Sequence, residues 1–298
     1  MNTALETVLI LLAIFFFGIQ PIAMKKIKEI SLRVNILQTG LFSLVVAVCF
    51  WIWAACAKFT FSGVTIAYGA LFGAGLIATI ACYYYAMHTG PLSYTSFFYS
   101  ASMVIPALAG VLIWKQQFRW TAGLGIAMFL IAFFFISVPG SKNNGKANRK
   151  WLLLCLATWF LNGSLSVIVT AQQMATGGKE ASSLTTLAFS FAFLFAIITY
   201  YILAAAKGEL KQTGPEIRSM KAYTGPLLVL ALGNGGGNFT ITYLSSRVDS
   251  TYLFPVVLGG MMVAVTIYSI LALKEKINKY GLTGLIIGIA ALLILNIH

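Results

Sequence analysis

Apolar residues gather along the chain in ten blocks separated by short polar segments. Each block has about 20 residues, the length that an α-helix needs to cross the hydrocarbon core of a bilayer. Backbone groups in lipid must be paired within their own segment, and the blocks lack the alternating pattern of a porin strand, so helices are expected rather than sheet. The predicted fold class is an all-α integral membrane protein with ten transmembrane helices, at residues 6–24, 33–57, 64–87, 92–114, 120–139, 151–172, 182–206, 223–245, 251–273 and 281–297.

The second part of the chain resembles the first. A shift of 159 residues places Tyr84 on Tyr243 and Met103 on Met262, and lays "LIWKQQFRW" over "LALKEKINK". Upstream, "LAIFFFGIQ" resembles "LATWFLNGS" at a shift of 144. We therefore expect five helices followed by five more: a first repeat at 1–139, a linker at 140–150 and a second repeat at 151–298.

Loop charges indicate that the two repeats are inverted relative to each other. The Lys and Arg counts of the four loops between helices run 4, 1, 0, 2 in the first half and 1, 4, 1, 3 in the second. An odd number of spans per repeat inverts the second copy, so a shared cytoplasmic side requires this change of parity. Inverted repeats are typical of secondary transporters, whose substrate site lies near the midplane between the halves. The positive-inside rule places the linker in the cytoplasm and both termini outside.

Composition excludes a soluble domain and restricts the chemistry. The chain is 59% hydrophobic and 9% charged, with a mean hydropathy of +0.89. Its net charge of +13 comes from Lys and Arg in short loops, where anionic lipid headgroups rather than nucleic acid are the expected partners. The four cysteines form no CxxC pair, so neither a metal site, a cofactor nor a disulfide framework is expected. Glu6 and the lack of a basic segment before the first apolar block favour a retained first helix over a cleaved signal peptide.

Two segments of the second half carry a family resemblance. They are "LKEKINKYGLTGLIIGIAALLIL", Leu273 to Leu295, and "FPVVLGGMMV", Phe254 to Val263. They resemble the drug/metabolite transporter superfamily in its ten-helix EamA-like branch, although Gln116 stands in the first half where Glu275 stands in the second. The resemblance implies two inverted five-helix repeats around a central cavity, alternating access, and a location in a bacterial plasma or inner membrane. Members of the family usually keep both termini in the cytoplasm, so the orientation stays open.

The stretch "ALGNGGGNFTITYL", Ala231 to Leu244, holds unusual polar material for an apolar block. Three of its polar residues stand at i, i+4 and i+8, on one face of a helix. A shift of 159 residues brings that face onto a second set in the third block. An amide that faces lipid is costly, so both sets are expected to bond neighbouring helices or to line a wet cavity. The two sets are Asn234, Asn238 and Thr242, and Gly75, Thr79 and Tyr83.

Other candidates come from helix breaks and aromatic residues. Gln20 precedes Pro21 in the first block and aligns with Ser164, which follows Asn162. Proline kinks a helix, and broken helices often mark transport sites. Tyrosines in a cavity stack on planar solutes, which adds Tyr99 and Tyr252. The predicted substrate-binding residues are Gln20, Thr79, Tyr83, Tyr99, Asn162, Ser164, Asn234, Asn238, Thr242 and Tyr252.

No Asp or Glu stands in the middle of a block, which argues against an organic-cation substrate and simple proton antiport. The function that fits is a monomeric secondary transporter of a small neutral or zwitterionic metabolite, such as an amino acid, a nucleoside or a vitamin-like compound. A lipid flippase and a multidrug exporter are alternatives. A membrane enzyme acting on a lipid-linked substrate would need an acid–base pair at bilayer depth, which two histidines and no buried acid supply poorly, so no catalytic residue is predicted.

Overall fold

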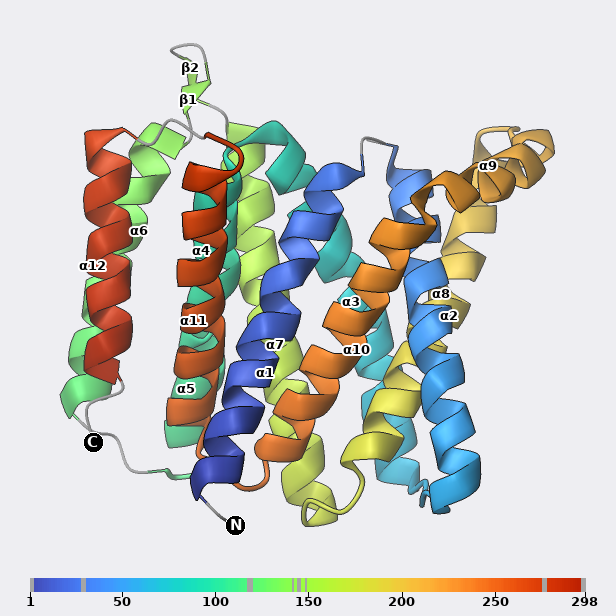
Figure 1. The fold of residues 1–298 in the computed structure, drawn as a ribbon, viewed down its shortest axis with the longest axis horizontal. Coiled ribbons are helices and arrows are strands. Elements are labelled where there is room, and N and C mark those ends of the chain that lie inside the picture. The colour runs from blue at the N-terminus through green and yellow to red at the C-terminus, as the bar shows by residue number, and fades with distance from the viewer. Residues whose placement is uncertain are drawn as a thin grey trace.

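The computed structural model describes residues 3–27, 31–116, 120–140, 142–143, 146–147, 149–274 and 278–295. Helices make up almost all of this part of the chain, and they stand side by side as a single layered bundle (Figure 1). The elements are α1 Thr3–Lys26, α2 Leu32–Ala57, α3 Gly63–Thr89, α4 Leu92–Ala101, α5 Val104–Leu112, α6 Trp120–Gly140, β1 Lys142–Asn143, β2 Lys146–Ala147, α7 Arg149–Thr176, α8 Ala181–Ala206, η1 Leu210–Gln212, α9 Thr213–Ser219, η2 Met220–Tyr223, α10 Thr224–Leu244, α11 Ser250–Leu271 and α12 Lys279–Leu295.

Among the described residues, seven helical segments are long and apolar enough to cross a membrane by length and composition. They coincide with α1, α2, α3, the α4–α5 pair, α7, α8 and α11. The 21 residues of α10 have the length of a span, but their glycines and asparagines dilute its apolar character. The chain is therefore an all-α, multi-pass membrane protein.

The predicted block 92–114 is divided into two helices, which the apolar pattern does not reveal. Pro106 has no backbone N–H to donate to the Ser102 carbonyl. The N–H of Ile105 donates to that carbonyl instead, at 3.0 Å. From α7, Trp159 donates to the Ala101 carbonyl at 3.1 Å and Asn162 to the Tyr99 carbonyl at 3.3 Å. By contrast, α1 and α11 stay continuous around Pro21 and Pro255.

The helices pair across the two halves of the chain. The closest neighbours are α1 with α10 and α11, α3 with α7 and α8, α2 with α8 and α10, α11 with α4 and α5, and α6 with α12. In Figure 1, α6 and α12 form one end of the bundle and α2 with α8 the other. Glycines permit close approach: a Cβ on Gly73 of α3 would lie 2.7 Å from the backbone N of Ala192, and one on Gly233 of α10 would lie 2.7 Å from the Phe16 carbonyl oxygen.

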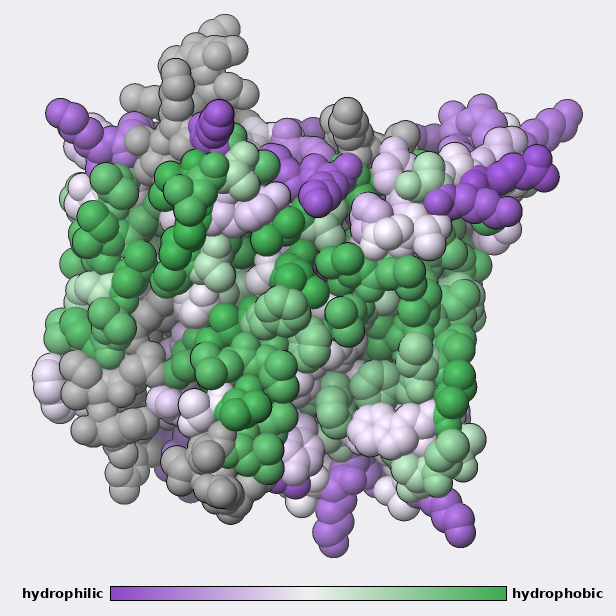
Figure 2. Space-filling model, viewed as in Figure 1, coloured by the Kyte–Doolittle hydropathy of each residue, from purple (hydrophilic) through white to green (hydrophobic). Residues whose placement is uncertain are grey.

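Charge is distributed unequally over the two polar faces. The face at which α1 ends, α2 begins and α9 lies is here called the basic face; α1 begins and α12 ends at the opposite face (Figure 1). Figure 2 shows hydrophilic residues crowded on the basic face and a broad apolar belt below it. By the ends of the helices that carry them, the basic face has Lys25, Lys26, Arg33, Arg149, Lys150, Lys207, Lys211, Arg218, Lys221, Lys274 and Lys279, and the opposite face has Lys58, Lys115, Lys179 and Arg247.

Candidate functional site

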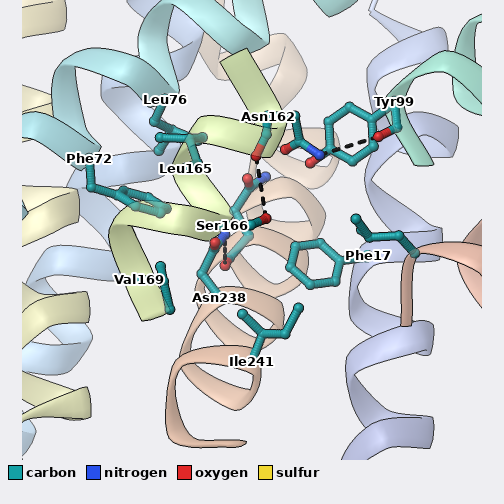
Figure 3. A pocket seen from close by; sticks show the side chains of 12 residues that line it. Phe17, Phe72, Leu76, Tyr99, Asn162, Leu165, Ser166, Val169, Asn238 and Ile241 are labelled. Atoms are coloured by element: carbon teal, nitrogen blue, oxygen red, sulfur yellow. Dashed lines mark hydrogen bonds between the residues drawn. The ribbon is translucent and has the colours of Figure 1, made fainter. Parts of the chain in front are cut away.

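A small cavity lies in the centre of the bundle, where six helices meet (Figure 3). Its volume is ≈ 20 Å³, which is room for about one water molecule. The first half of the chain contributes α1, α3 and α4, and the second contributes α7, α10 and α11. The lining side chains are Phe17, Phe72, Leu76, Tyr99, Asn162, Leu165, Ser166, Val169, Asn234, Asn238, Ile241 and Leu258.

Three asparagines and one serine supply the polar part of the wall. Asn162 donates to the Ser102 hydroxyl at 2.7 Å, Asn234 to the Leu230 carbonyl at 3.1 Å, and Asn238 to the Asn234 carbonyl at 2.9 Å. Within the described residues, no hydrogen bond is donated to the Oδ1 atom of any of these three amides. The cavity therefore offers acceptor oxygens to a solute, and no charged side chain of the described residues lines it.

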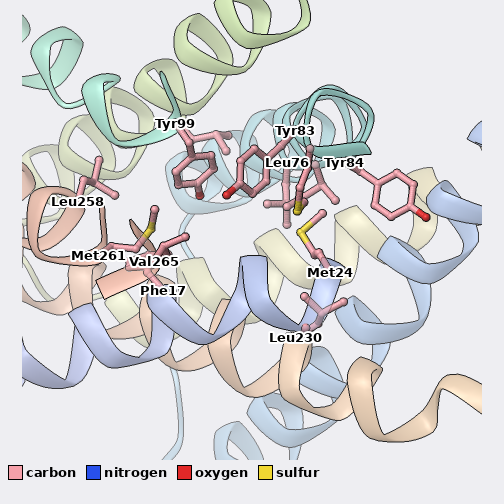
Figure 4. Close-up of a cluster of buried hydrophobic side chains, with 14 of the residues drawn as sticks. Phe17, Met24, Leu76, Tyr83, Tyr84, Tyr99, Leu230, Leu258, Met261 and Val265 are labelled. Atoms are coloured by element: carbon pink, nitrogen blue, oxygen red, sulfur yellow. The ribbon is translucent and has the colours of Figure 1, made fainter. Parts of the chain in front are cut away.

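Aromatic rings form one side of the cavity. The Tyr99 ring lies 4.7 Å from the Tyr83 ring between centroids, at an interplanar angle of 40°. Tyr83 lies beside Tyr99 in the buried cluster of Figure 4 and shares a 2.9 Å hydrogen bond with Ser96. This contact restricts the orientation of the Tyr99 ring, which faces the cavity together with Phe17 and Phe72.

The structure brings four of the predicted site residues to the cavity wall and leaves six outside it. Tyr99, Asn162, Asn234 and Asn238 line the cavity. Outside the lining, Thr79, Ser164 and Thr242 each donate to the carbonyl four residues earlier in their own helix, and Tyr83 is packed beside Tyr99. Gln20 is buried against Gly233, with no hydrogen-bond partner for its Nε2 among the described residues, and Tyr252 is partly buried in α11.

Two lining residues that sequence reasoning missed did carry a signal. Ser166 follows Asn162 by four residues, the same spacing that singled out Asn234 and Asn238. Leu258 stands 159 residues after Tyr99, which is the shift that aligns the halves. Phe17, Phe72, Leu76, Leu165, Val169 and Ile241 are residue types that also fill the core, so nothing in the sequence distinguishes them.

An ionic cluster around the buried side chain of Arg33 lies at the basic face. Arg33 of α2 binds Glu209 at 2.6 Å and also forms an ion pair with Glu216. Tyr200 of α8 donates to Glu216 at 2.8 Å. These contacts hold α2, α8 and the α9 segment together.

A second polar cluster lies at the opposite face. Glu180, just before α8, accepts hydrogen bonds from the Ser62 hydroxyl at 2.8 Å and from the Thr65 hydroxyl. Gln172 of α7 donates to Thr65 at 2.6 Å. Partial burial raises the pKa of the Glu180 carboxyl, but the hydrogen bonds from Thr65 and Ser62 outweigh it and leave the pKa below its usual value. The beginnings of α3 and α8 are thereby tied to each other.

Comparisons with known proteins agree with this architecture. One solved structure, described only as the crystal structure of a protein, is 14% identical, with a TM-score of 0.62 over 99% of this chain and 98% of its own. That likeness shows the fold alone, and no curated protein matches the chain. Residues 5–138 match the profile of the EamA-like transporter family. The match agrees with the resemblance to the drug/metabolite transporter superfamily that the sequence predicts, and it covers the first half of the chain.

Proposed function

We propose that the protein is a secondary transporter that moves a small neutral or zwitterionic metabolite across a bacterial plasma membrane by alternating access. One observation carries the proposal: the central cavity is lined by three helices from each half of the chain. These helices hold matching places in the two halves, α1 with α7, α3 with α10, and α4 with α11. A site shared in this way by two halves is the arrangement expected of a transporter that opens alternately to either side.

The proposed architecture is ten transmembrane helices in two inverted repeats, at 1–139 and 151–298, joined by the linker at 140–150. If each helix is replaced by its counterpart in the other repeat, the pair α1–α10 becomes the pair α7–α3. Both pairs are in close contact. The excess of Lys and Arg on the basic face supports a cytoplasmic position for that face and an outside position for both termini. Since one chain supplies both halves of the pathway, we propose that it works as a monomer.

The chemistry of the cavity supports a solute that carries N–H donors and a flat or apolar surface. The free amide oxygens of Asn162, Asn234 and Asn238 can accept from an amine or amide group. Phe17, Phe72 and Tyr99 offer ring surfaces. An amino acid, a nucleoside or a vitamin-like compound combines these features, and no charged wall residue is available to neutralise an ionic solute of one sign.

The size of the cavity supports an occluded state between the two open ones. A space of ≈ 20 Å³ excludes a metabolite, so the wall must separate on one side before a solute enters. The Arg33 cluster joins α8 to α2 at the basic face, and the Glu180 cluster joins α8 to α3 at the opposite face. We propose that they open in alternation, each being re-formed while the other is broken.

The test begins with a thermal-shift screen of the purified protein against metabolites, since a ligand of the folded state raises its apparent stability. The hit is then followed as radiolabelled uptake into proteoliposomes. Removal of one uncharged hydrogen bond in Asn238→Ala should weaken apparent affinity by about fivefold. Thr240→Ala is the matched control, because Thr240 is buried in α10 but lines no part of the cavity.

Saturable flux whose apparent affinity is weakened in Asn238→Ala and unchanged in Thr240→Ala would support the proposal. Lipid scrambling without solute flux would overturn it and favour a flippase. Flux of many unrelated cations would favour a multidrug exporter.

A further inference from the structure

A groove runs along the outside of the bundle between α2 and α10, apart from the central cavity. It consists of two hollows of ≈ 260 and ≈ 330 Å³ that share Val45 and Leu228. The first begins at Lys221 on the basic face, and the second reaches Cys49 and Gly236, nearer the opposite face. At that end the groove passes Gly235 and Gly236, which Val46 and Phe16 contact.

The groove faces the space that a membrane occupies. Leu228 is 52% exposed and Leu232 is 55% exposed, although both lie within an apolar helix. From Thr224 to Gly236 the helix rises by about 18 Å, which is close to one leaflet of the hydrocarbon core, about 15 Å. The groove thus has the length of a single acyl chain that enters from the basic face.

Positive charge marks the mouth of the groove. Lys221 lines it, and Arg218, one turn earlier in the chain, lines a neighbouring hollow with Gly214, Pro215 and Ser219. The acidic side chains of the same segment, Glu209 and Glu216, are both bound to Arg33. Within the described part of the chain, neither Lys221 nor Arg218 lies within salt-bridge distance of an acid, so both can bind a phosphate from outside the protein.

We propose that the α2–α10 groove is a binding site for one anionic glycerophospholipid. Its phosphate contacts Lys221 at the mouth of the groove, and its anionic headgroup extends to Arg218 in the neighbouring hollow. One acyl chain lies along Val45, Leu228 and Leu232 to Gly236. Bulk lipid contacts the rest of the surface whatever its headgroup, whereas this site selects a lipid whose headgroup is negatively charged. The proposal does not depend on the identity of the transported solute.

The experiment uses the full chain in a non-ionic detergent with phosphatidylglycerol or phosphatidylcholine, each carrying a photoreactive diazirine in the same acyl chain. Crosslinked peptides are located by mass spectrometry. Phosphatidylglycerol should label α2 and α10 along the groove more strongly than phosphatidylcholine. Lys221→Gln and Arg218→Gln should each reduce its labelling by about fivefold, because one basic residue near a membrane surface contributes about that factor.

Matched controls separate the charge from the groove. Lys179→Gln removes a basic residue from the opposite face and should leave labelling unchanged. Leu232→Trp fills the groove and should reduce labelling by both lipids, whereas Leu194→Trp, at a similarly exposed position of α8, should not. Thermal unfolding and gel filtration of each variant confirm that it is folded.

Three results would overturn the proposal. One is equal labelling of the groove by the two lipids in the unchanged protein. Another is labelling by phosphatidylglycerol that survives both Lys221→Gln and Arg218→Gln in folded protein. The third is a dimer whose crosslinks show Leu228 and Leu232 covered by a second copy.

Discussion

The seams α3–α8 and α10–α2 hold matching places in the two proposed repeats, but the helices are packed differently in them. In the first, a Cβ on Gly69 would lie 2.9 Å from the Leu187 Cβ, and one on Gly73 would meet the α8 backbone. In the second, α10 directs Gly233 and Gly237 at α1 instead, where Phe16 and Phe17 lie. Among the glycines of α10, only Gly235 contacts α2, and it does so through the Val46 side chain. The groove lies beside this contact.

The difference shows what the glycines and asparagines of α10 achieve together. Asn234 and Asn238 turn to the cavity, and the glycines beside them let α1 close one side of that cavity. The helix cannot press equally against α1 and α2, so the α2 side is left open. In α3 the corresponding positions are Gly75 and Thr79, and its glycine pair is free to pack against α8.

The largest difference between the two seams should appear when one methyl group is added to each of them. Gly73→Ala places the new carbon against the backbone N of Ala192, which cannot rotate away, and we expect a loss of about 3 kcal/mol in the free energy of unfolding. Gly235→Ala meets only the flexible end of Val46 and should lose about 1 kcal/mol or less, since alanine also favours the helix. Thermal unfolding in detergent measures both.

Gly225→Ala is the control for this pair, because no atom lies within 4 Å of a Cβ added there. It should leave the melting temperature unchanged or raise it. Equal losses in Gly73→Ala and Gly235→Ala would show that the two seams are packed alike.

A smaller effect is expected at the basic end of the α2 seam. Arg33→Met leaves Glu209 and Glu216 without their cation, and removal of one partner of a buried ion pair commonly costs several kcal/mol. Both carboxylates are partly exposed, which reduces the expected loss in unfolding free energy to about 2 kcal/mol. Limited proteolysis between Ala206 and Thr224 should accelerate. Protection identical to that of the unchanged protein would contradict a role for this cluster in holding α9.

The opposite end of the α3–α8 seam should respond to pH. Because the pKa of Glu180 is lowered in the folded protein, its stabilising contribution is present above the ordinary carboxyl pKa and is lost as pH falls through the folded value. Glu180→Gln removes this contribution, about 1 kcal/mol at neutral pH. Melting temperatures from pH 7 down to about pH 3 should therefore fall more steeply in the unchanged protein than in the variant. Parallel curves would assign the acid sensitivity to another group.

Sequence patterns predict the positions of the helices better than their packing. Apolar blocks locate each helix to within a few residues, because lipid imposes a length and a composition. They cannot reveal the break between α4 and α5, which depends on Pro106 together with Asn162 and Trp159 of another helix. Among the site candidates, the i, i+4 spacing identifies Asn234 and Asn238. Gln20 and Thr79 show that a polar residue in a span can instead be buried against a neighbouring helix or bonded to the backbone of its own helix.

The smallest effect on stability is expected at the prolines Pro106 and Pro255. Their substitution also tests most directly how the two halves differ. Pro106→Ala restores an N–H that can reach the Ser102 carbonyl, so α4 and α5 can join into one helix. Such a change draws the Tyr99 carbonyl away from Asn162 and should slow transport several-fold while it alters the melting temperature little. Pro255→Ala lies in a helix that is already continuous and should change neither. Hydrogen exchange over residues 99–107 measures the joining directly: slower exchange in Pro106→Ala than in the unchanged protein is expected, and unchanged exchange with normal transport would show that the break is imposed by α7 alone.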